Sequence, residues 1–344
     1  MKRADFIDVR SDTVTRPTAA MLEAMVRAPV GDDVFGEDET VNALQCKVAD
    51  LFGMQAALFC LSGTMTNQIA IKLHTQPGDE VICDQLAHVY LYEGGGIAVN
   101  SQASVRVLQG DHGRFTAAQV RDNVNRRSDS HYPWTRLVAI ENTVNRGGGC
   151  CWDLGELRRI RKVCDDERLA LHLDGARIFN ALAATQATAR QYGELFDTVS
   201  VCLSKGLGAP AGSVLLGTRD HIGRAHRFRK VMGGGMRQAG YLAAAGLYAL
   251  DHHVERLLED HRKARMLATE LERLPFVATV FPVQTNIVIF RLDARASSDA
   301  FLAHLLDHGV KASGIGPQLI RFVFHLDVSD EQLDALVAAT RSFS

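Results

Sequence analysis

The stretch LALHLDGAR at residues 169–177 decides the fold of this chain, because an apolar run ends there in a carboxylate and a glycine and a helical pattern follows. The same unit, a short apolar run followed by a helical segment, recurs through much of the chain. Such an alternation is typical of a mostly parallel sheet that is covered by helices on both faces. The other apolar runs lie at residues 56–61, 80–83, 104–108, 137–140, 198–203 and 213–217.

The sequence before the first apolar run predicts an arm and two helices. The polar stretch RSDTVTRP at residues 10–17 is expected to form an arm or loop. Its last residue, Pro17, suits the first turn of a helix that reaches residue 27. Thr40 is expected to cap the second helix, and Gly53 is expected to end it.

The last third of the sequence has a different pattern. One long helical pattern from about residue 240 to 273 is followed by a mixture of strands and helices, which predicts a small α+β unit. Because one hydrophobic core rarely serves more than about 250–300 residues, we expect two domains: a large one over residues 1–250, with an arm at 1–20, and a small one over 251–344. The expected strands lie at 277–281, 286–290 and 319–324, and the expected helices at 298–307 and 330–341.

Composition restricts the class of protein. The net charge of −2 argues against nucleic acid or an acidic membrane as a partner, and no apolar stretch approaches the roughly 20 residues that span a bilayer. The seven Cys residues are odd in number and irregularly spaced, which is typical of reduced thiols in a cytoplasmic protein. No zinc-binding spacing occurs, so we predict no metal site.

Three strand ends carry candidate chemistry, since ligands of open α/β sheets bind beyond the carboxyl ends of the strands. In ALFCLSGTMTNQ, residues 57–68, a strand stops at Ser62-Gly63-Thr64 and a helix begins. The free amides of a helix start form an anion site that suits a phosphate. The alternative is an ordinary helix cap without a ligand.

The other two strand ends carry a buried carboxylate and a buried amine. Asp174 ends the strand of residues 169–173, and burying its charge is costly without a cationic partner; a salt bridge to Arg177 or a helix cap is the alternative. Lys205 follows the strand in TVSVCLSKGLG, residues 198–208. A desolvated Lys becomes a neutral amine that can form a Schiff base, although a Lys can also extend to solvent.

Together these features match the three groups by which pyridoxal 5'-phosphate is held. The helix start binds its phosphate, Lys205 binds its aldehyde, and Asp174 faces its pyridine nitrogen. The sequence has no Walker A pattern, and Gly206-x-Gly208 lacks the third glycine of a dinucleotide-binding motif.

Six motifs, in order along nearly the whole chain, resemble those of the fold-type I pyridoxal phosphate enzymes, and specifically the L-threonine aldolases of the β-eliminating lyase group. The resemblance implies an aspartate-aminotransferase-like large domain, a small amino-acid substrate, and a homotetramer built from dimers that share active sites. The motifs are RSDTVTRP at 10–17, GDDVFG at 31–36, AHVYLYE at 87–93, HLDGARIFN at 172–180, LSKGLG at 203–208 and GGGMRQ at 233–238.

The resemblance also implies roles for individual residues. Lys205 binds the cofactor aldehyde, Asp174 pairs with the pyridine nitrogen and His88 stacks on the ring. Further contacts to the cofactor and the substrate follow by position. Gly63, Thr64 and Ser204 bind the cofactor together with Arg177, and Arg237 reaches its phosphate from a neighbouring subunit; Ser11, Arg177 and Arg321 bind the substrate carboxylate; His131 and a neighbour's Tyr92 lie near the β-hydroxyl and side chain.

One position departs from the family pattern, and several functions remain open. In ENTVN, residues 141–145, many family members have His where this chain has Val144.

The expected reaction is cleavage of L-threonine or L-allo-threonine to glycine and acetaldehyde, with His88, His131 or a water that they hold as the base. The alternatives are another pyridoxal phosphate enzyme, either a β-eliminating lyase or an aminotransferase, a cofactor-free Schiff-base aldolase on a barrel, and a non-catalytic metabolite-binding protein.

Overall fold

A seven-stranded sheet forms the centre of the computed structural model, which describes residues 6–343. Every apolar run predicted from the sequence is a strand of this sheet, and all neighbouring strands are parallel except at β8, which is antiparallel to both of its neighbours. The mostly parallel sheet is therefore confirmed. In spatial order the strands are β2 (Ala56–Cys60), β8 (Ser213–Gly217), β7 (Thr198–Cys202), β6 (Ala170–Gly175), β5 (Thr135–Glu141), β3 (Glu80–Asp84) and β4 (Ser104–Leu108).

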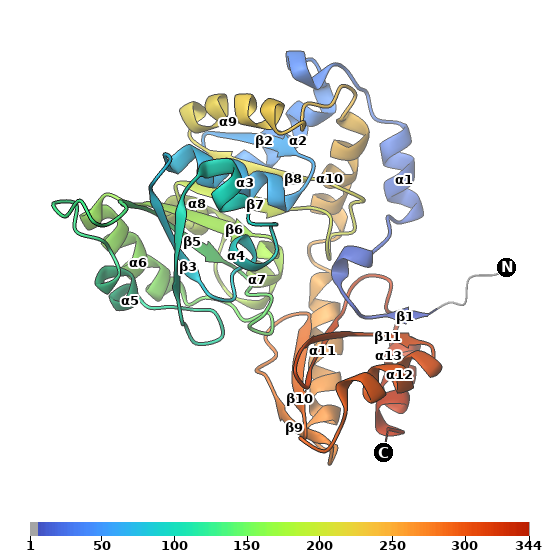
Figure 1. Cartoon of the computed structure of the whole chain (residues 1–344). Helices are drawn as coiled ribbons and strands as arrows, with labels where there is room; N and C mark the ends of the chain where they lie inside the picture. The colour runs from blue at the N-terminus through green and yellow to red at the C-terminus, as the bar shows by residue number, and fades with distance from the viewer. Residues whose placement is uncertain (1–5, 344) are drawn as a thin grey trace.

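Helices cover both faces of this sheet (Figure 1). Alternate residues of one strand enter different apolar clusters: Phe59 of β2 joins the largest cluster, whereas Leu58 and Cys60 join another. This period of two is what a strand buried on both faces requires. The helices of this part are α1 (Ala19–Val26), α2 (Glu39–Phe52), α3 (Gly63–His74), α4 (His88–Leu91), α5 (Ala117–Asp122), α6 (Leu154–Glu167), α7 (Ile178–Ala184), α8 (Ala189–Leu195), α9 (Arg219–Val231) and α10 (Gly240–His252).

A four-stranded antiparallel sheet, in the order β12-β13-β10-β9, forms the smaller part of the fold, seen below the large sheet in Figure 1. This part has its own apolar cluster, which supports our proposal that a domain boundary lies near residue 250. Its elements are α11 (Leu257–Leu271), β9 (Val277–Val280), β10 (Ile287–Leu292), α12 (Ser298–Asp307), β11 (Val310–Lys311), β12 (Ser313–Gly316), β13 (Leu319–Val323) and α13 (Asp330–Arg341).

The N-terminal segment divides its contacts between the two parts. The short strand β1 (Ile7–Asp8) pairs in parallel with β11, and Ile7 and Val9 belong to the apolar cluster of the small part. The sequence interpretation had placed residues 1–20 as an arm of the large domain; residues 1–5 lie outside the described residues. Residues 7–9 join the small part instead, because two apolar side chains of a short strand gain burial there.

Two helix predictions were wrong in detail. The pattern at 240–273 is two helices, α10 and α11, because the chain turns at His253, whose Nδ1 donates to the carbonyl of Leu207 at 2.7 Å. Helix α2 is capped by Asp38 and not by Thr40, since the Asp38 carboxylate accepts from the amide of Val41 at 3.0 Å. The Gly53 terminus is confirmed, with a φ of 64°.

No helix of the described part is long and apolar enough to cross a membrane. The seven Cys side chains are free thiols, and Cys46 is the exposed one.

Close packing between α8 and α2 makes a testable prediction. A Cβ at Gly193 of α8 would lie 1.9 Å from the carbonyl oxygen of Phe52, so Gly193→Ala should destabilise the fold by about 1–3 kcal/mol through overpacking. The matched control is Gly223→Ala on α9, where a Cβ would meet nothing within 4 Å. That change should stabilise the fold by about 0.5–1 kcal/mol through helix propensity. Urea unfolding measures both, and an equal effect of the two variants would contradict the packing argument.

Candidate active site

The carboxyl ends of β5, β6 and β7 meet at one edge of the large sheet. Register aligns Glu141 of β5 with Asp174 of β6, and Asp174 with Ser200 of β7, so side chains distant in sequence become neighbours. Lys205 follows three residues after β7. A cavity of about 140 Å³ lies at this edge, and the residues that line it are Gly63, Thr64, Asn67, His88, Asp174, Ala176, Cys202, Ser204 and Lys205.

The start of α3 provides the anion-binding turn of this cavity. Ser62 caps the helix, and its Oγ accepts from the amide of Met65 at 3.2 Å. Gly63 lies against β7 so closely that a Cβ would be 2.5 Å from Cys202 Sγ. Glycine thus lets the first helical turn approach the strand end, and Gly63 and Thr64 bring to the cavity a helix start, a type of position at which free amides can bind an anion.

Asp174 is a buried carboxylate, 2% exposed, whose oxygens accept from neutral donors. Oδ1 accepts from the amide of Ala176 at 3.1 Å and Oδ2 accepts from Asn67 Nδ2 at 2.9 Å. Among residues 6–343 no Arg, Lys or His forms an ion pair with it, so the predicted alternative of a salt bridge to Arg177 is wrong. Lys205 lines the same cavity, with Nζ 3.8 Å from Cys202 Sγ.

Arg177 is paired with Asp12 instead. Its Nε and Nη2 donate to the two carboxylate oxygens of Asp12 at 2.8 and 2.6 Å, and both side chains are buried. Burial alone would raise the pKa of Asp12, but the charge and hydrogen bonds of Arg177 outweigh burial and hold the pKa at about 2. Asn286 also donates to Asp12 Oδ2 at 3.3 Å and to the carbonyl of Phe324 at 3.0 Å.

A cationic cleft of about 480 Å³ adjoins the cavity and shares His88 and Lys205 with it. Arg321 of β13 donates to Asn145 Oδ1 at 2.8 Å and to the carbonyl of Arg10 at 3.0 Å, while its buried Nε has no partner among the described residues. Burial and the like charge of Arg177 lower the pKa of Arg321 to about 10. The other residues that line the cleft are Ser11, Thr13, Tyr92, Asn145, Arg146, Arg177, Ser313, Gly314 and Ile315.

Three carboxylates, those of Glu93, Glu141 and Asp174, lie near His88. The amide of His88 donates to Glu141 Oε2 at 2.8 Å, and its Nδ1 lies 2.9 Å from Glu93 Oε1. Burial would lower the pKa of His88, but the hydrogen bond to Glu93 and the nearby carboxylates raise it. Burial, together with the charge of Asp174, raises the pKa of Glu141 to about 7.

Ten of the twelve predicted site residues line the cavity or the cleft, and two do not. His131 lies on the surface, with its side chain 88% exposed and its Nδ1 2.8 Å from Asp129 Oδ1. Arg237 forms an ion pair with Asp32 at 2.8 Å, away from the Gly63 turn in its own chain. Tyr92 was predicted to act from a neighbouring subunit, yet it lines the cleft of its own chain because α4 places it one turn after His88.

Val144, where this chain departs from the family pattern, does not line the cleft. Val144 is buried in the main apolar cluster, and its amide donates to the carbonyl of Cys150 at 3.1 Å. The next two residues, Asn145 and Arg146, line the cleft instead.

The sequence interpretation missed five polar residues that hold the site. Each is buried or half-buried and bonded to a predicted residue. All five lie inside stretches quoted in the sequence analysis, which was the available signal, but the pattern does not show what each one contacts. The five are Asp12, Asn67, Glu93, Glu141 and Asn145.

Comparisons with known proteins match the whole chain. The model of the family described as "Beta-eliminating lyase" matches residues 8–295. The low specificity L-threonine aldolase of Escherichia coli K12 is 43% identical over 98% of this chain and 99% of its own length. The low specificity L-threonine aldolase of Saccharomyces cerevisiae is 40% identical over 96% of this chain and 85% of its own length.

Solved structures agree in fold. A threonine aldolase from Leishmania major has a TM-score of 0.86 at 22% identity, over 97% of this chain and 98% of that chain. A serine palmitoyltransferase from Sphingomonas wittichii has a TM-score of 0.76 at 16% identity, over 98% of this chain and 86% of that chain. The fold-type I assignment is confirmed, and the fold is not the barrel that a cofactor-free aldolase would need.

The buried Asp12–Arg177 pair predicts a pH-dependent loss of stability. Asp12→Asn leaves Arg177 buried without a counter-charge, which should cost about 3–5 kcal/mol of unfolding free energy at neutral pH. Because folding lowers the pKa of Asp12 from 3.8 to about 2, its contribution is complete above pH 3.8 and disappears as the pH falls through about 2. Urea unfolding from pH 7 to pH 2 should therefore show the wild type and the variant converging.

A matched control for this prediction is Glu23→Gln, which breaks the exposed Arg27–Glu23 pair. Exposed pairs of this kind contribute about 0–1 kcal/mol. A loss for Asp12→Asn no larger than for this control would show that the buried pair does not stabilise the fold.

Proposed function

The chain belongs to the β-eliminating lyase family, and from that premise we propose that it cleaves L-threonine and related β-hydroxy-α-amino acids to glycine and an aldehyde. The chain is a pyridoxal phosphate-dependent carbon–carbon lyase of fold type I. One observation carries the choice of chemistry: an amine, a buried carboxylate that has no ion pair with any residue of 6–343, and a helix start line one cavity that adjoins a cleft of arginines.

The residues of the cavity fit pyridoxal phosphate. In the part of the chain that the structure describes, the donors to the buried carboxylate of Asp174 are neutral, and a protonated pyridine nitrogen would supply a positive charge beside it. Lys205 would bind the aldehyde, Gly63 and Thr64 the phosphate, and His88 would lie against the ring. When bound, this cofactor withdraws electrons from the α-carbon of an amino acid, which weakens a bond at that carbon.

The chain's own residues then select which bond breaks. The buried Nε of Arg321 has no partner among the described residues, and Arg177 retains Nη1 because Asp12 occupies its other two donor atoms. These donors, with the hydroxyl of Ser11, would hold the substrate carboxylate. A carboxylate held by these donors would leave the Cα–Cβ bond, rather than the Cα–H bond, aligned with the electron-withdrawing system of the cofactor, which would favour cleavage of this bond over loss of the α-proton.

His88 is the group best placed to move the proton of the β-hydroxyl. It lines both the cavity and the cleft, and an imidazole exchanges protons near neutral pH. The proton leaves the hydroxyl as the Cα–Cβ bond breaks, and the aldehyde departs through the cleft. A second proton must return to the α-carbon before glycine leaves.

We extend the proposal to assembly and location. The family resemblance supports a homotetramer in the cytoplasm that serves threonine breakdown and glycine supply. Exposed apolar side chains on several elements, including Val26, Phe35 and Val231, support an oligomer because each would be covered by a neighbouring subunit. In such an assembly Arg237 would reach a neighbour's phosphate, and His131 would be free to approach a neighbour's cleft.

The reaction is tested by product analysis and by the attachment of the cofactor. Purified protein with pyridoxal phosphate should release equal amounts of glycine and acetaldehyde from L-threonine and L-allo-threonine. Ammonia with a keto acid would indicate a β-eliminating lyase, and transfer of the amino group would indicate an aminotransferase. After borohydride reduction, the intact mass of the wild type should rise by one reduced cofactor. Lys205→Ala should gain no such mass, whereas Lys162→Ala, a change on the exposed face of α6, should match the wild type.

The carboxylate role of Arg321 is tested by kinetics. Arg321→Met removes a charged donor of the substrate carboxylate, so KM for L-threonine should rise about 10- to 100-fold, as expected for a hydrogen bond to a charged group. Arg291→Met is the matched control, because Arg291 lies on the neighbouring strand β10 and is exposed. An unchanged KM for Arg321→Met would remove Arg321 from substrate binding.

A further inference from the structure

We propose that Glu93 is a positioning residue, a buried carboxylate that fixes a proton on Nδ1 of His88 and, through the amide of Asn67, joins His88 and Asp174 in one hydrogen-bonded unit. The inference rests on the proposed function, because it concerns the proton transfer assigned to His88. In this arrangement Nε2 is the atom of His88 that gains and loses the proton.

Both oxygens of Glu93 are fully used by donors, and its side chain has no exposed surface. Oε1 accepts from Asn67 Nδ2 at 2.8 Å and lies 2.9 Å from His88 Nδ1, and Oε2 accepts from Gln68 Nε2 at 2.6 Å. Within residues 6–343 neither Arg nor Lys forms an ion pair with it. A buried carboxylate needs compensation, and His88 is the one titratable donor among its partners.

The orientation of the Asn67 amide follows from its neighbours. Its Nδ2 lies 2.8 Å from Glu93 and 2.9 Å from Asp174, and its Oδ1 lies 3.1 Å from Nε2 of His172. The reverse orientation would place the amide oxygen against two carboxylates, which only accept hydrogen bonds. Asn67 therefore donates to both acids and receives from His172, so Glu93 and Asp174 are two charged groups joined by one amide.

The same reasoning fixes the proton of His88. An ionised Glu93 can only accept, so His88 Nδ1 must carry hydrogen whenever the 2.9 Å bond exists. One ring nitrogen is thereby committed to the network. The remaining nitrogen, Nε2, is the one that can take the β-hydroxyl proton, and the bond to Glu93 keeps the ring from rotating away from the cleft.

Charges from several elements act on His88. The polar atoms of His88, Glu93 and Asp174 lie within 4.8 Å of one another, and burial, which would lower the pKa of His88, is outweighed first by the bond to Glu93 and then by the charges of Asp174 and Glu141. The cleft also places positive charges near His88. The groups that face His88 are Tyr92 and Glu93 after α4, Glu141 of β5, Asp174 of β6, and the cleft residues Lys205, Arg177 and Arg321.

A purely structural role for Glu93 predicts something different. Asn67 would still be held by Asp174 and His172. An uncharged Gln at position 93 has the same shape, its Oε1 can still accept from Asn67 and His88, and its amide can donate to Gln68 Oε1 once the amides of Gln68 and Asn100 both rotate. If Glu93 only fills space, Glu93→Gln should leave the ionisation of His88 unchanged.

The test measures the ionisation of His88 directly. Hydrogen–deuterium exchange at the imidazole C2 position, followed by mass spectrometry, gives the pKa of single histidines in the intact holoenzyme. In the wild type, His88 should titrate above 6.5. In Glu93→Gln its pKa should fall by about one unit or more, since an opposite charge at this distance shifts a pKa by about 1–3 units.

Kinetics of L-threonine cleavage supplies the second measurement. A base works when deprotonated, so kcat/KM should rise with pH through the pKa of His88, and this limb should move to lower pH in Glu93→Gln by the same amount. Above the limb the weaker base should lower kcat about tenfold or more, with KM little changed because the carboxylate-binding arginines are intact.

Gln68→Met is the matched control, because it removes a hydrogen bond to the same carboxylate but leaves its charge. It should shift the pKa of His88 far less than Glu93→Gln does. An unshifted His88 in a folded Glu93→Gln protein, or a wild-type His88 that titrates below 6.5, would overturn the inference. The wild-type measurement needs no variant to fold. Absence of glycine release from wild-type enzyme would instead refute the proposed function, because the exchange measurement requires no turnover.

Discussion

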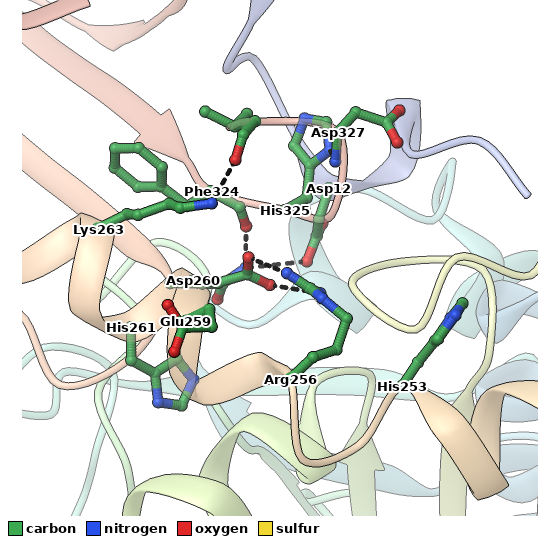
Figure 2. A network of polar contacts seen from close by, with 12 residues as sticks. Asp12, His253, Arg256, Glu259, Asp260, His261, Lys263, Phe324, His325 and Asp327 are labelled. Carbon is green, nitrogen blue, oxygen red and sulfur yellow. Dashed lines mark hydrogen bonds and ion pairs between the residues drawn. The ribbon is translucent and has the colours of Figure 1, made fainter. Parts of the chain in front are cut away.

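The buried ion pair between Asp12 and Arg177 connects three parts of the chain at the active site. Asp12 comes from the N-terminal segment, Arg177 follows β6 of the large sheet, and Asn286, which bonds Asp12, precedes β10 of the small sheet. Figure 2 shows Asp12 and Phe324, which Asn286 links by hydrogen bonds, together with the Arg256–Asp260 ion pair at the start of α11. Neither charge of the central pair can be buried alone, so the N-terminal segment and both sheets must be in place before the cleft exists.

The pair also affects which charged groups of the site are left without a counter-charge. Because Asp12 neutralises Arg177, Arg321 remains a cation of the cleft whose buried Nε has no partner among residues 6–343, where a substrate carboxylate would bind. Asp174 lines the adjoining cavity, and Asp174 and Glu93 both accept hydrogen bonds from Asn67. The cleft would thus stabilise a negative substrate group, and the acids at the cavity would stabilise a positive cofactor ring. That separation lets one chain hold opposite charges in adjoining spaces, since each has its own counter-charges.

The sequence predicts the large sheet well. Its strands are buried on both faces and are therefore continuous apolar runs, a pattern that differs from that of the helices of this chain. It predicts the small elements poorly. The pair β1–β11 has two residues in each strand, too short for a periodic signal. The helical pattern at 240–273 continues through the break at His253, because the turn depends on the carbonyl of Leu207, which lies 46 residues earlier.

The same physical limit separates the site residues that could be predicted from those that could not. Asp174 and Lys205 are conspicuous because a charged residue ends an apolar run, and that contrast is local. Glu93 lies in a polar segment, where a carboxylate is ordinary; its importance arises from Asn67, 26 residues earlier, and from the single amide that this Asn shares with Asp174, 107 residues further along. Local contrast therefore identifies the groups that would meet the cofactor. The groups that would set the protonation of the site's residues are defined by tertiary contacts, because only the folded chain decides which acid lies beside which imidazole.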